Sequence, residues 1–162
     1  MAEIQIASGH TVIIDDCDVS LVTDTKWRYY AKCRKWYVVR PPLYGKYKRE
    51  QYLHRLIAVA ASGQIVDHIN GDTLDNRREN LRIVNVTQNA RNRQKQKKPT
   101  ASRFKGVCFD KRHKSRPWLA SIRTDHGRKH LGQFATEHEA AKAYDAASQE
   151  FHGAFGSRNS VK

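Results

Sequence analysis

The stretch that decides the fold reads IVDHINGDTLDNRRENLRIV and covers residues 65–84. Its two ends, residues 65–68 and 81–84, are short and rich in β-branched residues, which predicts two strands. Asn70-Gly71-Asp72, behind the first strand, has the residues that favour turns. The segment that follows is polar and has Asn85 at a helix-capping position, which predicts a helix. We therefore expect the order strand, long loop, strand, helix.

Side chains of this stretch have the chemistry needed to cut a phosphodiester bond. A divalent cation that neutralises a phosphate prefers oxygen ligands, which Asp67 and the side chain of Asn89 would supply. His68 is the candidate general base, since a neutral imidazole with its ordinary pKa of roughly 6.5 can take a proton from water. Adjacent residues of a regular strand point to opposite faces, so Asp67 and His68 can share a site only if the strand ends there. Asn80 is placed to hydrogen-bond the loop backbone and hold it against the strand that carries His68.

This run resembles the HNH endonuclease family, in particular the subgroup of phage and intron-encoded homing enzymes. An Asp-His pair, a middle Asn and a further Asn in place of the final His form the motif of that subgroup. The resemblance implies a ββα-metal (His-Me finger) fold, with Asp67 and Asn89 as metal ligands, His68 as general base and Asn80 as the residue that braces the loop. Without the final His, a hard cation such as Mg²⁺ or Mn²⁺ suits the site better than Zn²⁺.

Two alternatives stand beside this interpretation. The Asp and Asn side chains of such a loop can also serve only to form hydrogen bonds with backbone N–H and C=O groups, with no catalytic role. His54, in Leu53-His54-Arg55-Leu56, matches the segment that precedes the motif in the subgroup. For His54 we favour packing or hydrogen bonding over metal binding.

The first fifty residues predict a small β-rich region. Short apolar or aromatic runs at residues 4–6, 12–14, 27–30 and 36–39 read as strands. A short helix is expected around residues 20–26. A further apolar helix is expected over residues 53–61, closed by Ser62-Gly63.

The last sixty residues predict a second folding unit. Residues 104–109, 118–123 and 129–134 read as three strands, and residues 136–152 as a helix that begins with a Thr136–Glu139 capping box. Ala140, Tyr144, Ala147 and Phe151 form one stripe of this helix, which we expect to pack on the three-stranded sheet.

This region resembles the plant APETALA-two/ethylene-response-factor DNA-binding domain over residues 102–161. The resemblance is carried by Gly106-Val107, WLASIR at 118–123, LGQF at 131–134 and AAKAYD at 140–145. It implies a sheet that lies in the major groove of double-stranded DNA. The implied base contacts are Lys105, Trp118, Arg123 and Arg128, and the expected phosphate contacts are Arg103, Arg112, Arg116 and Lys129.

Some features limit that second resemblance. Cys108 and His130 stand where the plant domains have an arginine and a tryptophan, so the plant sequence preference is not transferred. Trp118 could equally be a core or edge aromatic. The basic side chains could form a solvated face that contacts no DNA.

Charge supports a polyanionic partner. The formal net charge of the 162 residues is +14. Residues 91–130 contain fourteen Lys and Arg but only Asp110 and Asp125. Nearly all the excess lies there, which indicates a nucleic-acid footprint to which Arg91 and Arg93 also belong.

Together these patterns predict an α+β protein with a β-rich region at 1–50, an HNH nuclease motif at 51–98 and a DNA-binding domain at 99–162. The alternative function is a DNA-binding regulator that has lost nuclease activity. Cys17, Cys33 and Cys108 show no metal-binding spacing and are expected to be reduced thiols. No run is apolar enough for a membrane span or signal peptide, so we expect a cytoplasmic, phage- or mobile-element-encoded protein, with a monomer favoured.

Overall fold

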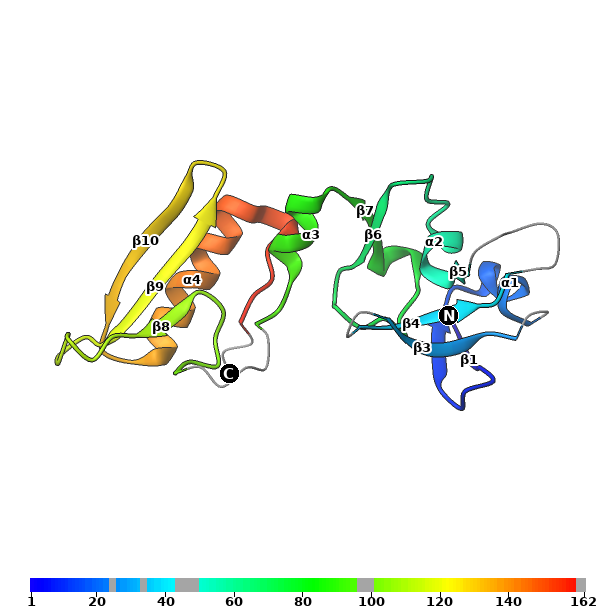
Figure 1. Cartoon of the computed structure of the whole chain (residues 1–162), viewed down its shortest axis with the longest axis horizontal. Helices are drawn as coiled ribbons and strands as arrows, with labels where there is room; N and C mark the ends of the chain where they lie inside the picture. The colour runs from blue at the N-terminus through cyan, green and yellow to red at the C-terminus, as the bar shows by residue number, and fades with distance from the viewer. Residues whose placement is uncertain (24–25, 33–34, 43–49, 96–100, 160–162) are drawn as a thin grey trace. The chain divides into compact units, whose positions relative to one another are not determined.

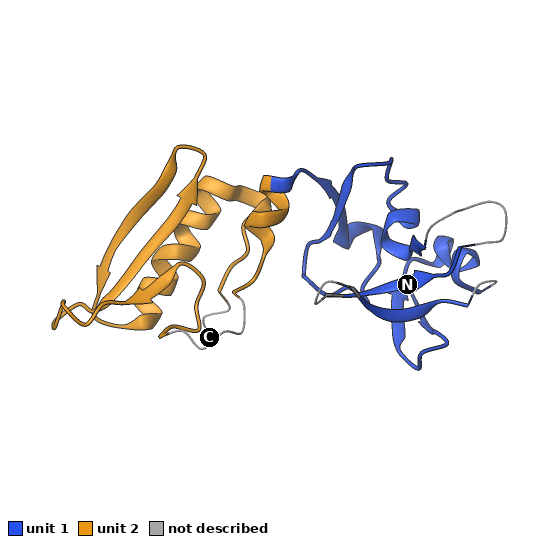
Figure 2. Ribbon diagram, viewed as in Figure 1, with its two compact units in different colours: residues 1–86 blue, residues 87–162 orange. Residues whose placement is uncertain are grey.

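The computed structural model describes residues 1–23, 26–32, 35–42, 50–95 and 101–159. It divides into two compact units, residues 1–86 and 87–162 (Figure 2). These limits differ from the predicted boundaries at residues 50 and 98, because residues on both sides of position 50 share one hydrophobic core. Cys33, part of the expected 20–26 helix and part of the basic joint at 91–98 lie outside the described residues.

The first unit is built from small antiparallel sheets and short helices (Figure 1). Its N-terminal elements are β1 (Ala2–Gln5), β2 (Thr11–Ile14), η1 (Asp16–Asp18), α1 (Ser20–Thr23), β3 (Arg28–Lys32), β4 (Lys35–Arg40), β5 (Gln51–Tyr52) and α2 (Leu53–Ile57). β1 pairs with β2, and β3, β4 and β5 form a sheet in that order. β6 (Ile65–His68) pairs antiparallel with β7 (Leu81–Val84), which follows η2 (Arg78–Asn80).

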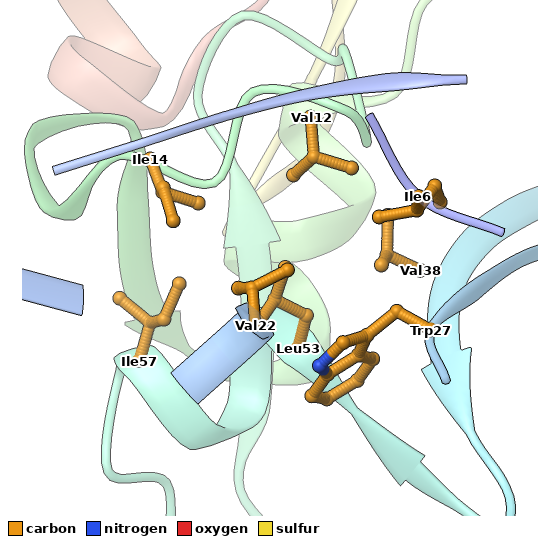
Figure 3. Packing of buried hydrophobic residues seen from close by; sticks show 8 residues of the cluster. All are labelled: Ile6, Val12, Ile14, Val22, Trp27, Val38, Leu53 and Ile57. Atoms are coloured by element: carbon orange, nitrogen blue, oxygen red, sulfur yellow. The ribbon is translucent and has the colours of Figure 1, made fainter. Parts of the chain in front are cut away.

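One hydrophobic core holds the first unit together. Trp27, Val38 and Leu53 are almost fully buried and meet Val12 and Ile14 of β2 (Figure 3). Side chains from residue 6 to residue 57 belong to this cluster, and Leu74 and Leu81 pack against it. The β-rich region is therefore the support on which the β6–β7 hairpin rests.

The second unit is a three-stranded sheet covered by one helix. Its elements are α3 (Val86–Asn92), which begins at the last residue of the first unit, and then β8 (Val107–Phe109), β9 (Trp118–Thr124), β10 (Gly127–Phe134), α4 (Glu137–His152) and η3 (Gly153–Phe155). The strand order is β10-β9-β8, and α4 packs against all three strands (Figure 1). The predicted Thr136–Glu139 capping box is present at the start of α4. Ala140, Tyr144 and Ala147 of the predicted stripe are buried against the sheet, and Phe151 is partly buried.

Two elements are shorter than the sequence predicts. The first C-terminal strand was expected over residues 104–109 but begins at Val107, because Gly106 has a φ of +75° and breaks the extended backbone. A Cβ at Gly106 would lie 2.0 Å from the Tyr144 ring, so this turn lets the strand approach α4. Helix α2 ends at Ile57, well before residue 61, and Val59 adopts a positive φ of 49° in the turn that follows. No helix in the described part of the chain is long and apolar enough to cross a membrane.

Candidate active site

The β6–β7 hairpin positions the Asp67-His68 pair. Asp67 lies opposite Arg82 and His68 opposite Leu81 in the strand register. β6 ends at His68, as Asn70-Gly71 led us to expect, and the chain turns through a hydrogen bond from the Gly71 N–H to the His68 carbonyl, 3.0 Å long. Both residues therefore stand at the end of the strand, but regular pairing up to that point directs their side chains to opposite faces of the hairpin.

Asp67 forms an ion pair with its cross-strand neighbour. Arg82 donates to Asp67 Oδ2 from Nε at 3.2 Å and from Nη2 at 3.0 Å. The two side chains are only 11 and 14% exposed, so the pair compensates charges that are mostly withdrawn from water.

His68 faces the interior of the first unit. Its exposed fraction is 5%, its ring meets the ring of His54 at a centroid distance of 5.2 Å, and its Nε2 lies 3.3 Å from Asn76 Oδ1. Burial lowers the pKa of His68 below its ordinary value of 6.5, although the hydrogen bond with Asn76 and the charge of Asp67 act in the opposite direction. The imidazole is therefore neutral at neutral pH and has a lone pair that can accept a proton.

His54 is a packing residue in this structure. Its ring lies 5.4 Å from Tyr37, 5.6 Å from Tyr52 and 5.2 Å from His68, measured between ring centroids. Burial lowers the pKa of His54 to about 3, with a further contribution from nearby His68. This agrees with the packing role expected from the sequence. His54 is an uncharged aromatic ring that packs against His68.

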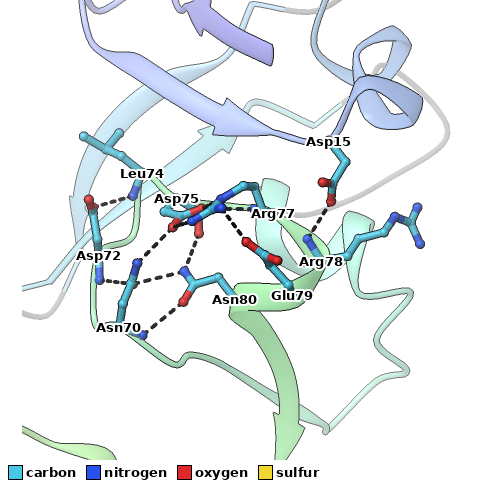
Figure 4. Close-up of polar contacts among 9 residues, drawn as sticks. All are labelled: Asp15, Asn70, Asp72, Leu74, Asp75, Arg77, Arg78, Glu79 and Asn80. Carbon is cyan, nitrogen blue, oxygen red and sulfur yellow. Dashed lines mark hydrogen bonds and ion pairs between the residues drawn. The ribbon is translucent and has the colours of Figure 1, made fainter. Parts of the chain in front are cut away.

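The loop between the strands is held by a polar network (Figure 4). Asn80 Oδ1 accepts from the Asn70 N–H at 3.0 Å, and Asn80 Nδ2 donates to Asn70 Oδ1 at 3.0 Å and to the Asp75 carbonyl at 2.7 Å. Asp75 is buried and receives Nε and Nη2 of Arg77, whose hydrogen bonds hold the pKa of that carboxyl below its ordinary value. The Asn80 carbonyl also accepts from the Ile69 N–H at 2.9 Å, so Asn80 binds directly to the residues that follow His68.

The N-terminal region anchors the other side of the loop. The Ile13 N–H donates to the Leu74 carbonyl at 2.9 Å, and the Asn76 N–H donates to the Ile13 carbonyl at 2.8 Å. Arg78 makes a two-pronged ion pair with the buried carboxylate of Asp18, at 2.7 and 2.8 Å. β2 and η1 therefore fix the loop that surrounds His68.

The donor atoms suit a hard cation only in part. Within the described residues, no three His, Cys, Asp or Glu side chains form a group that could hold a metal ion. Asp67 supplies one carboxylate, which lies on the opposite face of the hairpin from His68 but is close enough for its charge to act on the imidazole. Asn89 lies on α3, which belongs almost entirely to the second unit, so its place in the site stays a prediction. Such a set fits a cation that takes most of its ligands from water and the phosphate, as Mg²⁺ commonly does.

The outer face of the second unit's sheet carries part of the predicted DNA-contact set. Arg123 of β9 pairs directly with Arg128 of β10, and both are exposed. Side chains alternate along a strand, and Ala120 and Ile122 of β9 are buried on the side of α4. Ser121 and Arg123 therefore lie on the other face, as do their cross-strand partners His130 and Arg128. Like charges directly opposite each other on neighbouring strands repel, so this face concentrates positive charge at some cost in stability.

Other predicted contact residues have partners inside the second unit. Lys105 Nζ donates to the carbonyls of Arg91 and Arg93, each at 2.6 Å, and to Ser157 Oγ at 2.8 Å. Arg91 pairs with Asp125, and Arg112 pairs with Asp110. Trp118 lies with the hydrophobic cluster under α4 and meets Phe109 edge-on, which is the packing role left open for it.

The remaining predicted cations are exposed. Lys129 Nζ lies 4.4 Å from the centre of the Phe151 ring, and Arg103 Nη2 lies 3.1 Å from His138 Nε2. Arg93 and Arg116 are also exposed. These side chains keep positive charge at the surface of the second unit.

Sequence reasoning missed two residues of the site, Asn76 and Arg82. The cross-strand position of Arg82 could have been found by aligning the two predicted strands, since Asp67 and Arg82 are register partners. Asn76 stands inside the decisive stretch, but its contact with His68 depends on how the loop folds back on β2.

Comparison with known proteins agrees with the motif. Residues 51–91 match the family model described as HNH endonuclease. A protein of Acanthamoeba polyphaga mimivirus named as an uncharacterized HNH endonuclease is 29% identical over 149 residues, which are 88% of this chain and 75% of that protein. No solved structure matches the chain.

Proposed function

We propose that this protein is a divalent-metal-dependent endonuclease of the HNH kind that hydrolyses phosphodiester bonds in double-stranded DNA. The observation that carries the proposal is a neutral His68 at the end of β6, next to Asp67, inside the segment that matches the HNH model. The likeness to an HNH protein of a virus supports an origin in a phage or another mobile element.

In the proposed reaction, His68 removes a proton from a water molecule whose oxygen attacks the scissile phosphorus. The bond from phosphorus to the leaving oxygen breaks, and that oxygen takes a proton from solvent. Asp67 and Asn89 would hold Mg²⁺ or Mn²⁺, which when bound neutralises charge on the phosphate and the leaving oxygen. Arg82 keeps Asp67 in place from the opposite strand, and Asn80 keeps the loop closed around the end of β6.

We propose that the second unit holds the DNA. A major groove about 12 Å wide admits a β-ribbon, and Arg123 and Arg128 form an exposed cross-strand pair on the sheet. Arg103, Arg116 and Lys129 would contact phosphates, as would Arg93 after α3. The internal partners of Lys105 and Arg91 support a structural role for those two side chains.

One observation favours a second candidate, a DNA-binding regulator without nuclease activity. His68 is 5% exposed and Asp67 is paired with Arg82, so water and a phosphate must gain access before chemistry can begin.

Incubation of supercoiled plasmid with the full chain and Mg²⁺, Mn²⁺ or Zn²⁺ tests the proposal. We expect nicked product with Mg²⁺ or Mn²⁺, since one chain carries one His68 and one Asp67. His68→Ala should reduce cleavage by roughly 10²–10⁴-fold and leave DNA affinity nearly unchanged. His10→Ala, which removes an imidazole from the β1–β2 turn of the same unit, serves as the control. Wild-type protein that binds DNA but never cuts it would leave the regulator.

A further inference from the structure

An exposed tryptophan lies near the turn of the β3–β4 hairpin. Trp36 is 50% exposed, whereas Trp27 is buried and Trp118 is partly buried. The Trp36 ring stacks on the ring of Tyr29, with the two centroids 5.2 Å apart and the planes at 28°. One face of the indole is therefore supported by a second aromatic ring, while half of the residue's surface is open to solvent.

Tyr29 is held in place by contacts of its backbone, its ring and its hydroxyl. Its N–H donates to Ser8 Oγ at 2.9 Å, its hydroxyl lies 3.1 Å from Thr73 Oγ1, and its ring packs against the hydrophobic core of the first unit. Thr73 belongs to the loop between β6 and β7, and its carbonyl accepts a hydrogen bond from Asn76 Nδ2 at 3.1 Å. The stacked pair is thereby attached to the loop that surrounds His68, and little of its own freedom is left to lose when a ligand binds.

The sequence around the stacked pair is basic. Residues 26–40 contain six Lys and Arg and no Asp or Glu. Arg28, the neighbour of Tyr29 in β3, is exposed. Aromatic rings among cations are typical of surfaces that bind single-stranded nucleic acid, because bases stack on the rings while phosphates meet the cations. An acidic peptide would also meet the charges, but a nucleic-acid strand supplies a flat ring for every negative charge.

We propose that Trp36, supported by Tyr29, is a stacking site for an unpaired base of a DNA strand. In a duplex the bases stack on one another and only their edges are accessible, so the site selects a nucleotide that is single-stranded or has left the stack. The consequence for the substrate rests on the proposed function: attached to the loop around His68, the site would favour duplex DNA with unpaired nucleotides near the cut. The stacking itself requires no nuclease activity.

Anisotropy of a labelled single-stranded oligothymidylate, titrated with the full chain in metal-free buffer, measures binding without cleavage. An abasic strand of equal length keeps the phosphates but has no ring to stack. We expect the wild-type protein to bind the oligothymidylate roughly 5- to 150-fold more tightly than the abasic strand, the range that corresponds to one stacked base. Equal affinities would overturn the proposal, because charge alone would then account for binding.

Variants of Trp36 locate the stacking. Trp36→Leu keeps apolar bulk but removes the aromatic face, so its preference for oligothymidylate over the abasic strand should disappear. Trp36→Phe keeps a smaller aromatic face and should keep most of the preference. Tyr30→Ala removes a similarly exposed ring from the opposite face of the same hairpin and is the matched control. A Trp36→Leu protein with the wild-type preference contradicts the proposal, and so does an equal loss in Tyr30→Ala.

Tryptophan fluorescence provides a second measurement, since a base that stacks on an indole quenches its emission. Trp27 and Trp118 also emit, so the part of the quenching that belongs to Trp36 is the part that Trp36→Phe lacks. We expect most of the wild-type quenching by oligothymidylate to be absent from Trp36→Phe, although this variant still binds. Quenching of equal size in both proteins would overturn the proposal. If the wild type shows the expected stacking but cuts no DNA, the nuclease proposal fails and the stacking site stands.

Discussion

At the scale of single residues, the imidazoles of His54 and His68, which meet edge to face, make the first unit sensitive to acid. Burial lowers both pKa values, that of His54 to about 3, from an ordinary value of 6.5. Below pH 6.5 these two histidines therefore bind protons in the unfolded chain but stay neutral in the folded chain. The free energy of unfolding falls as the pH falls towards 3. The fold is at its most stable, with respect to these groups, when both rings are neutral.

We expect the free energy of unfolding of the first unit to drop by about 2 to 3 kcal/mol between pH 6.5 and 4.5 through His54. Chemical unfolding followed by the NMR signals of residues 1–86 measures this drop. His54→Phe keeps an aromatic ring that cannot titrate, so its stability should depend on pH less steeply by that amount. Equal slopes for wild type and variant would show that His54 is protonated in the folded protein.

The residues of the candidate site show what sequence can and cannot provide. Asp67, His68, Asn80 and Asn89 stand out because spacing along the chain is visible in the sequence. Asn76 and Arg82 act through partners 8 and 15 residues away. Their roles depend on strand register and on the bridge between Ile13 and Asp75, which pairs residues from distant parts of the chain.

At the scale of elements, Lys105 holds the end of α3 against the rest of the second unit. Its ammonium donates to the carbonyls of Arg91 and Arg93, close to where the helix ends at Asn92, and to Ser157. Burial lowers the pKa of Lys105 to about 8, which is the cost of withdrawing the charge from water. The ammonium form still dominates near neutral pH, and in that form Lys105 makes three hydrogen bonds.

Lys105→Met should destabilise the second unit by about 1 to 3 kcal/mol, since it keeps the aliphatic stem but removes all three donors. Amide hydrogen exchange should rise at residues 91–93 and 157, while the β9–β10 pairing stays protected. Lys142→Met removes an exposed lysine of α4 and is the matched control. Unchanged exchange at residues 91–93 in Lys105→Met would mean that α3 is held by other contacts.

Helices and strands were predicted well where the local sequence has a single clear pattern. The sequence predicts a capping box and a buried stripe for α4, and both agree with the structure. β6 and β7 match residues 65–68 and 81–84 as expected. The prediction failed for the start of β8, because the turn at Gly106 is imposed by contact with Tyr144, a residue of another element.

At the scale of the whole molecule, the charge composition indicates that the protein binds a polyanion, but it does not indicate which Lys and Arg side chains contact that partner. The structure sorts them. Lys105 and Arg91 bind partners within the second unit, and Arg112 is exposed but paired with Asp110. The other six predicted cations are exposed: Arg93, Arg103, Arg116, Arg123, Arg128 and Lys129. The unit boundary after Val86 places all six in the second unit.

These six cations set the expected salt dependence of DNA binding. Each phosphate neutralised releases counterions, so six contacts give a slope of about −5 in log affinity against log salt, or a loss of roughly 10³-fold between 50 and 200 mM salt. Fluorescence anisotropy of a labelled duplex, measured without divalent metal so that no strand is cut, provides the slope. Arg116→Gln should weaken binding to any duplex and reduce the slope by about 1, as expected of a phosphate contact. Lys142→Gln removes the same charge from α4 and should change the slope little. A slope near zero for the wild type would mean that the second unit's charge does not serve to hold DNA.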